Sequence, residues 1–243
     1  WVIGLFLPKQ KVVFKDLIRI FFAALLGIAL NQALFFEGLS LTSPVDASMI
    51  HVLNPLIVLT LSSIFLKERV TVWKVIGIIL GASGAMMIIL NNGEIDFSSE
   101  NLLGNLLILA NCTAYASYLV VNKPLIQNYQ PMVLMKWLYL FGFILILPYA
   151  GSSVTEIQWS EISLNGWGAM FYIIVAVTFG AYYLTMYGLK SLSPLVVSVY
   201  IYLQPIFSTL IAIFYFHESV SIQKILASML IFGGVILASL RRS

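Results

Sequence analysis

Residues 38–44, GLSLTSP, are similar to residues 188–194, GLKSLSP, which lie 150 positions later. The same offset aligns residues 34–90 with residues 184–240 without a gap. Internal repeats in an apolar chain are typical of secondary transporters, so this repeat is the feature that decides the fold. The matched positions are Gly38-Leu39 with Gly188-Leu189, Ser43-Pro44 with Ser193-Pro194, Ser48 with Ser198, Asn54-Pro55 with Gln204-Pro205, Glu68 with Glu218, and Gly84 with Gly234.

The composition predicts a membrane protein. Hydrophobic residues make up 60% of the chain and charged residues 9%, whereas soluble domains carry about 25% charged residues. Such a chain cannot cover itself with a polar surface. The single cysteine, Cys112, excludes an intrachain disulfide, and no basic run with interleaved aromatic residues indicates nucleic-acid binding.

Eight stretches are apolar and long enough to cross a bilayer. All are expected to be helices, because lipid offers no partners for free backbone groups. The fold class is therefore all-α and polytopic, without a soluble domain. Residues 1–7 are apolar but too short to span, and we interpret them as the end of a further span. The eight stretches are residues 17–41, 45–66, 72–91, 102–122, 131–150, 165–189, 194–216 and 222–240.

Local signals agree with these boundaries. Thr71 and Ser221 stand where an N-cap is needed before the third and the eighth stretch. Pro44, Pro131 and Pro194 stand at first helical positions, where a missing N–H is harmless. The helices are therefore expected to begin close to these residues.

The basic residues predict how the chain is oriented. If the first loop lies inside the cell, 12 of the 13 Lys and Arg residues fall inside and only Lys224 falls outside. The repeat-equivalent spans then run in opposite directions, so the repeats are inverted, a geometry that supports alternating access. We predict two five-span repeats: residues 1–91, lacking the first span and most of the second, and residues 102–243.

These features resemble the EamA family of the drug/metabolite transporter superfamily. The resemblance covers nearly the whole chain. It implies ten spans around a central cavity, an inner or plasma membrane location, and both termini in the cytoplasm. It also implies export of amino acids, related metabolites or small drugs. The motifs that carry it are Gly38-Leu39, Thr42-Ser43-Pro44, Asn54-Pro55, Leu66-Lys67-Glu68-Arg69, Gly77 and Gly84, with Gly188-Leu189, Ser193-Pro194, Gln204-Pro205, His217-Glu218 and Gly233-Gly234 in the second repeat.

Polar side chains inside the spans are candidates for lining a substrate cavity, because they are costly to leave in lipid. Each has a structural alternative, namely interhelical packing or, for tyrosines, the interfacial aromatic belt. Tyrosine combines an apolar ring with one hydroxyl, which suits amphiphilic substrates. The candidates are Asn31, Ser48, His51, Asn54, Asn111, Tyr115, Tyr118, Tyr182, Ser198, Tyr202 and Gln204.

Two prolines predict breaks at repeat-equivalent places. Pro55 and Pro205 remove backbone hydrogen bonds within their spans, next to Asn54 and Gln204. Paired broken helices point to a binding site near the membrane midplane. The alternative is a structural kink. His51 has no counterpart in the second repeat, and is either a proton-coupling or substrate-binding group or a neutral histidine bonded between helices.

Three classes of function remain. A secondary carrier is the leading hypothesis, a channel or non-transporting membrane sensor is the second, and a membrane-embedded enzyme is the least favoured, because we find no paired acids or nucleophile–base pair within the spans. We expect no cofactor and no metal. The expected partners are a small-molecule substrate and the lipid bilayer. The glycines of residues 72–91 and 222–240 favour either a homodimer contact or packing within the chain.

Overall fold

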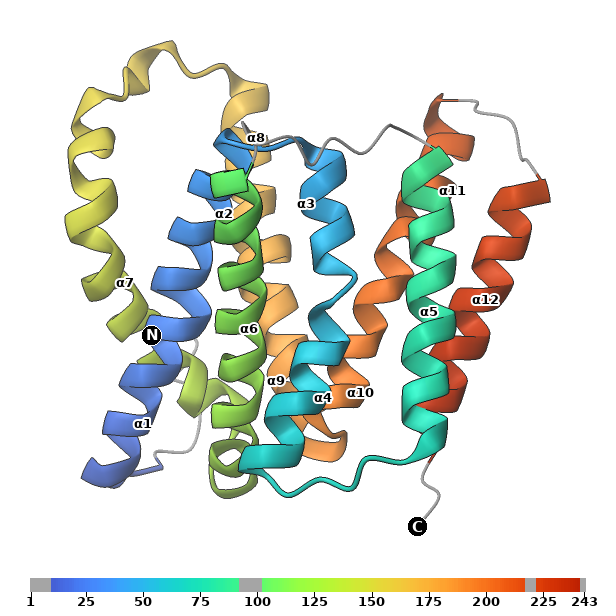
Figure 1. Ribbon diagram of the computed structural model, residues 1–243. Helices are drawn as coiled ribbons and strands as arrows, with labels where there is room; N and C mark the ends of the chain where they lie inside the picture. Colours follow the sequence, from blue (N-terminus) through green and yellow to red (C-terminus); the bar gives the residue numbers. More distant parts are fainter. Residues whose placement is uncertain (1–9, 92–101, 217–221, 241–243) are drawn as a thin grey trace. The chain divides into compact units, whose positions relative to one another are not determined.

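A computed structural model describes residues 10–91, 102–216 and 222–240 (Figure 1). The described residues form helices and connecting segments without strands, as the composition predicts. The expectations for residues 1–7, Ser221 and Glu218 lie outside the described residues. The same holds for the side chain of Lys224.

Each predicted span corresponds to one helix or to a series of consecutive helical segments. Six of them are long and apolar enough to cross a membrane: 14–40, 46–65, 72–90, 102–128, 131–151 and 164–191. The described apolar stretches of the last two spans, Pro194–Phe207 and Ile225–Ser239, are shorter. In chain order the segments are α1 (Phe14–Ala24), η2 (Leu25–Ala29), α2 (Leu30–Ser40), α3 (Pro44–His51), α4 (Asn54–Phe65), α5 (Val72–Asn91), α6 (Leu102–Asn128), α7 (Pro131–Glu156), η4 (Trp159–Glu161), α8 (Leu164–Tyr172), η5 (Ile173–Gly180), α9 (Ala181–Ser191), α10 (Pro194–Val199), η6 (Tyr200–Leu203), α11 (Gln204–Phe216) and α12 (Ile222–Ser239).

Two helices run further than hydropathy predicts. The fourth span was expected to end at residue 122, but α6 continues to Asn128 and contains Pro124. The fifth was expected to end at residue 150, but α7 continues to Glu156. Hydropathy marks only the part of a helix that sits in hydrocarbon. The extra turns of α6 combine buried Leu125 and Ile126 with Lys123 and Gln127, which hydrogen-bond to neighbouring segments, so the helix continues beyond the apolar stretch.

The chain divides into two compact units. Unit 1 comprises Trp1–Ala33 and Val121–Leu192, and unit 2 comprises Leu34–Val120 and Ser193–Ser243. Each unit draws segments from both sequence repeats. The units are described separately below.

Helix irregularities recur at repeat-equivalent positions. The first and sixth spans each contain a π-helical segment, η2 and η5, and residues 25–29 correspond to residues 175–179 within η5. The second and seventh spans are interrupted at Val52-Leu53 and at η6, so the predicted pair of breaks is confirmed. π-Helical turns are rare and often accompany functional sites. The repeat therefore extends to backbone geometry as well as to side-chain identity.

The predicted helix starts are also confirmed where the structure describes them. The Ser43 hydroxyl accepts a hydrogen bond from the Asp46 N–H at 3.0 Å, and the equivalent Ser193 hydroxyl accepts one from the Val196 N–H at 3.4 Å. The Thr71 hydroxyl accepts from the Lys74 N–H at 3.4 Å. Pro44, Pro131 and Pro194 each occupy the first turn of their helix.

Unit 2 contains the closest helix pair, α5 and α12, which lie side by side (Figure 1). A Cβ placed on Gly77 would lie 2.7 Å from the Gly234 carbonyl oxygen, and one placed on Gly84 would lie 2.6 Å from the Ala227 carbonyl oxygen. As numbers rise along α5 they fall along α12, so these repeat-equivalent helices are antiparallel. Small residues permit this close approach.

These contacts are reciprocal. Adding 150 converts Gly77 to Ala227 and Gly84 to Gly234, so the two contacts exchange under the repeat offset. Such exchange is the mark of a pseudo-twofold axis between α5 and α12. The sequence left open whether these glycines form a homodimer contact or pack within the chain. In the structure, Gly77, Gly84 and Gly234 pack within the chain. Gly233 is different, since nothing lies within 4 Å of a Cβ built on it.

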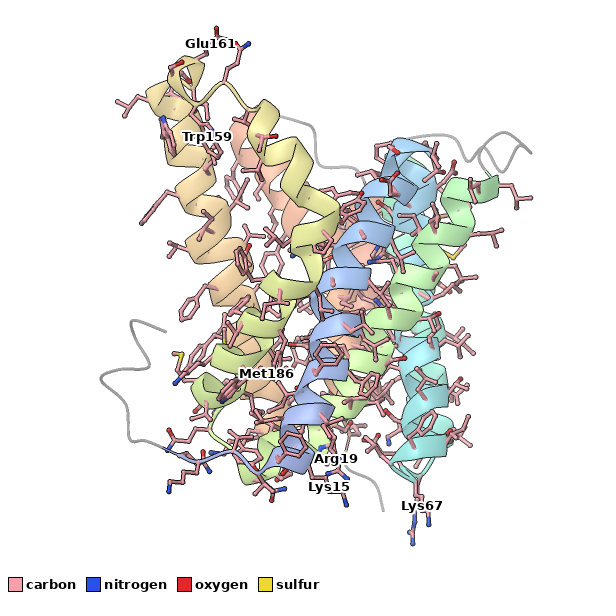
Figure 2. The ribbon with its side chains drawn as sticks, turned by 90° about the vertical axis from the view of Figure 1, so that its left-hand side faces the viewer. Lys15, Arg19, Lys67, Trp159, Glu161 and Met186 are labelled. Carbon is pink, nitrogen blue, oxygen red and sulfur yellow. The ribbon has the colours of Figure 1, made fainter. Side chains whose placement is uncertain are left out.

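Unit 1 has chemically distinct ends. Figure 2 shows Lys15 and Arg19 at one end of the unit and Trp159 and Glu161 at the other. Trp159 stacks on Trp167 with ring centroids 6.1 Å apart, as interfacial aromatic residues do. The basic end agrees with the clustering of Lys and Arg on one side that the sequence predicts.

Candidate functional site

The interruption between α3 and α4 sets the geometry of the candidate site in unit 2. Beyond the break, the N–H groups of Leu56 and Ile57 both donate to the Leu53 carbonyl, at 3.0 and 3.1 Å. In a regular helix Leu56 would instead donate to Val52. The break therefore frees the Val52 carbonyl oxygen, which accepts the Tyr202 hydroxyl at 2.9 Å.

Two polar atoms at this break have no hydrogen-bond partner among the described residues. They are Oδ1 of Asn54, whose side chain is only 2% exposed, and Nε2 of His51. The His51 ring makes an edge contact with Phe35, with centroids 5.9 Å apart. A buried amide oxygen without a partner costs about 1–3 kcal/mol. This local deficit marks the break as a place where a ligand could bond.

The packing around the break is apolar. Ala47 and Ile50 of α3 form a buried cluster with Ile108 and Cys112 of α6. The second half of the seventh span begins with Gln204, whose side chain is exposed, while α10 packs against α4. Asn54, the first residue of α4, is buried in this unit, whereas Gln204 is exposed.

The hydroxyl groups of three other candidates from the sequence donate hydrogen bonds to backbone carbonyls. The Ser48 hydroxyl donates to the Pro44 carbonyl at 2.7 Å, and the buried Ser198 hydroxyl donates to the Leu195 carbonyl at 2.7 Å. In unit 1, the Tyr182 hydroxyl donates to the Gly27 carbonyl at 2.6 Å. Each of these hydroxyls therefore satisfies a helix carbonyl.

The three candidates on α6 share a neighbouring region of unit 2. Asn111 and Tyr118 are buried, and Tyr115 is half-buried, with its ring 6.0 Å from that of Tyr118. Each makes an interaction with its surroundings. Asn31 of α2 is half-buried and also has a partner. The structure therefore places Asn111, Tyr115 and Tyr118 together, and Asn31 and Tyr182 in the other unit.

Tyrosine hydroxyls meet three of the irregular helices. Tyr202 bonds at the α3–α4 break, Tyr182 bonds to Gly27 in η2, and Tyr139 donates to the Thr178 carbonyl in η5 at 3.0 Å. Irregular backbone at membrane depth needs such partners. Tyr139, which is not among the candidates from the sequence, also belongs to this set. The π-helical segment that Tyr139 meets was not predicted from the sequence, which is why Tyr139 was missed.

Sequence reasoning missed one charged contact in unit 1. Nζ of Lys123 donates to the carbonyl oxygens of Leu189 and Leu192, both at 2.7 Å, at the C-terminal end of α9. Gln127 supports the same end by donating to the Lys190 carbonyl at 3.1 Å. The sequence presents Lys123 only as one more cytoplasmic charge. The contact joins residues more than 60 positions apart, so no local sequence signal identifies it.

No group of three or more His, Cys, Asp or Glu side chains that could hold a metal is found within the described ranges. The polar atoms at the break can form hydrogen bonds within an apolar surrounding. Asn54 Oδ1 accepts, and His51 Nε2 accepts or donates according to its tautomer.

Comparison with known proteins gives a consistent match. The model of the EamA-like transporter family matches residues 1–90 and 102–240. The chain is 24% identical to the uncharacterized transporter YyaM of Bacillus subtilis (strain 168), covering 95% of this chain and 76% of that protein. It is 27% identical to an uncharacterized transporter of Archaeoglobus fulgidus, covering 96% and 81%. A WAT1-related protein of Arabidopsis thaliana is 25% identical, covering 97% and 71%.

The fold also matches a solved structure. One crystal structure superposes with a TM-score of 0.80 at 21% sequence identity, covering 99% of this chain and 83% of that chain. At this identity the likeness shows the fold alone.

Proposed function

Because the chain belongs to the EamA-like transporter family, we propose that it is a secondary carrier that moves a small metabolite by alternating access. It is a multi-pass membrane transporter, and a transporter of this kind implies a small-molecule substrate and a lipid environment. The names of its family and relatives point away from an enzyme.

The observation that carries the proposal is the buried, unpartnered Asn54 Oδ1 at a helix break, with His51 Nε2 one turn away. In transporters, interrupted helices place free polar groups at the binding site. We assign substrate contact to Asn54 and His51. The substrate is then an amphiphilic compound with hydrogen-bond donors, such as an amino acid, and the proposed direction is export.

Two further assignments accompany this proposal. The basic end of unit 1, with Lys15 and Arg19, supports an orientation in which that end is cytoplasmic. The same charge rule, applied to Arg241 and Arg242 in the sequence, supports a cytoplasmic C-terminus. An inner or plasma membrane location goes with it. A homodimer, if it forms, would need a face other than Gly77, Gly84 and Gly234, which contact each other's helices within the chain.

The test is efflux from vesicles that contain the purified chain. Vesicles are loaded with a panel of amino acids, amines and organic acids, and release is followed over time. A carrier gives selective, saturable release with counterflow. Release that rises linearly with concentration and shows no counterflow would identify a channel, and absence of selective release of any member would contradict the export proposal.

Asn54→Leu is expected to lower transport by about tenfold while leaving thermal stability unchanged or raising it. The substitution removes an acceptor that no described residue uses, and leucine has a similar volume, so folding loses little. Asn105→Leu is the matched control. Asn105 Oδ1 accepts the Thr42 hydroxyl at 2.6 Å, so that variant should unfold at a lower temperature. If Asn54→Leu transports normally, Asn54 does not contact substrate.

A further inference from the structure

Tyr202 bonds to its own repeat equivalent. Its hydroxyl donates to the carbonyl of Val52, and the two residues are separated by 150 positions, the offset of the repeat. A pseudo-twofold axis brings a residue to its equivalent only if both lie next to that axis. Tyr202 and Val52 therefore lie beside the pseudo-twofold axis of unit 2.

The helix pair α5–α12 places the same axis independently. Its glycine contacts exchange under the repeat offset, as described above. The Tyr202 ring reaches this helix pair as well, because a Cβ built on Gly81 of α5 would clash with its Cδ2 atom. Tyr202 is 1% exposed, so its hydroxyl has no access to water as a substitute partner. The Tyr202 side chain therefore contacts both the α3–α4 break and α5, next to the pseudo-twofold axis.

The Tyr202–Val52 hydrogen bond has no symmetry-related counterpart. Exchanging the two repeats would require the side chain at position 52 to donate to the carbonyl at position 202, but position 52 is valine. The space for a ring is also missing on the other side, because the equivalent of Gly81 is Ile231. The backbone and the helix pair are symmetric here, whereas this hydrogen bond is not.

We propose that Tyr202 is a positioning residue that stabilises one of the two access states through its bond to Val52. The inference rests on the alternating-access mechanism proposed above. In an inverted-repeat carrier, each repeat takes the other's conformation when access switches sides. The switched state would then lack the Tyr202–Val52 bond. A group that bonds in only one state shifts the equilibrium toward that state.

Tyr202→Phe tests this assignment, because it removes only the hydroxyl and keeps the ring against Gly81. A buried hydrogen bond contributes about 1 kcal/mol, so the ratio of the two states should change about fivefold. The ratio is read as distance populations between spin labels on Lys15→Cys and Lys67→Cys, two exposed positions in different units, in a Cys112→Ala background. The two half-cycle transport rates should change in opposite directions.

Tyr139→Phe is the matched control. It also removes a hydroxyl that donates to a helix carbonyl, Thr178, but these residues are not repeat equivalents. It should lower stability without changing the distance populations. Unchanged populations in Tyr202→Phe would overturn the assignment, and so would an equal change in Tyr139→Phe. A wild-type protein with only one distance population throughout transport would instead contradict alternating access itself.

Discussion

Gly234→Ala is expected to destabilise the protein by about 2 kcal/mol or more, seen as a clear fall in the thermal unfolding temperature in detergent. The added Cβ would lie 2.5 Å from the Gly81 nitrogen and 2.6 Å from the Gly77 carbonyl oxygen. Both are backbone atoms, so no side-chain rotation relieves the clash, and α5 must move away from α12. Overpacking of this kind costs about 1–3 kcal/mol. Gly84→Ala should behave alike, because its Cβ would meet the Ala227 carbonyl oxygen at 2.6 Å.

The adjacent Gly233 gives a control with the opposite expected sign. A Cβ on Gly233 meets nothing within 4 Å, so Gly233→Ala keeps only the gain in helix propensity, up to about 1 kcal/mol. The same chemical change on neighbouring residues should therefore raise or leave unchanged the unfolding temperature in one case and lower it in the other. Equal shifts for both variants would show that the α5–α12 contact does not depend on these glycines.

The sequence predicts the positions of helices and helix breaks better than it predicts the hydrogen-bond partners of polar side chains. The 150-residue offset, the helix starts at Pro44 and Pro194 and the breaks near Pro55 and Pro205 are local or periodic signals, and all appear in the structure. The prolines act within one or two helical turns, and the offset is visible when the sequence is aligned with itself. They are therefore readable without knowing which helices become neighbours.

The roles of polar side chains depend on neighbours and could not be read in the same way. Tyr182 and Tyr202 look like cavity residues from their spacing, yet both donate to backbone carbonyls that helix irregularities expose. The sequence shows a hydroxyl within a span but not the carbonyl it meets, because that carbonyl lies on a helix more than 100 residues away. Asn54 shows the opposite case, since no described partner meets its Oδ1.

Lys123→Met is the second substitution with a large expected effect. The Lys123 ammonium caps two carbonyls at the end of α9, both at 2.7 Å. Hydrogen bonds to charged groups contribute about 1.5–3 kcal/mol each, and a cation at a helix C-terminus is further favoured by the helix dipole. Partial hydration of the released carbonyls offsets part of the loss. We expect a net destabilisation of about 2–4 kcal/mol, measured by thermal unfolding of the purified protein.

Lys15→Met controls for the loss of a positive charge. Lys15 is exposed at the basic end of unit 1 (Figure 2), so both variants remove one charge from the set that the sequence predicts to lie inside the cell. Lys15→Met should unfold near the wild-type temperature. Lys123→Arg should recover part of the stability, since its guanidinium also donates to carbonyls but with a different geometry. If Lys123→Met unfolds no earlier than Lys15→Met, then α9 does not need this cap, and Lys123 acts only as an orienting charge.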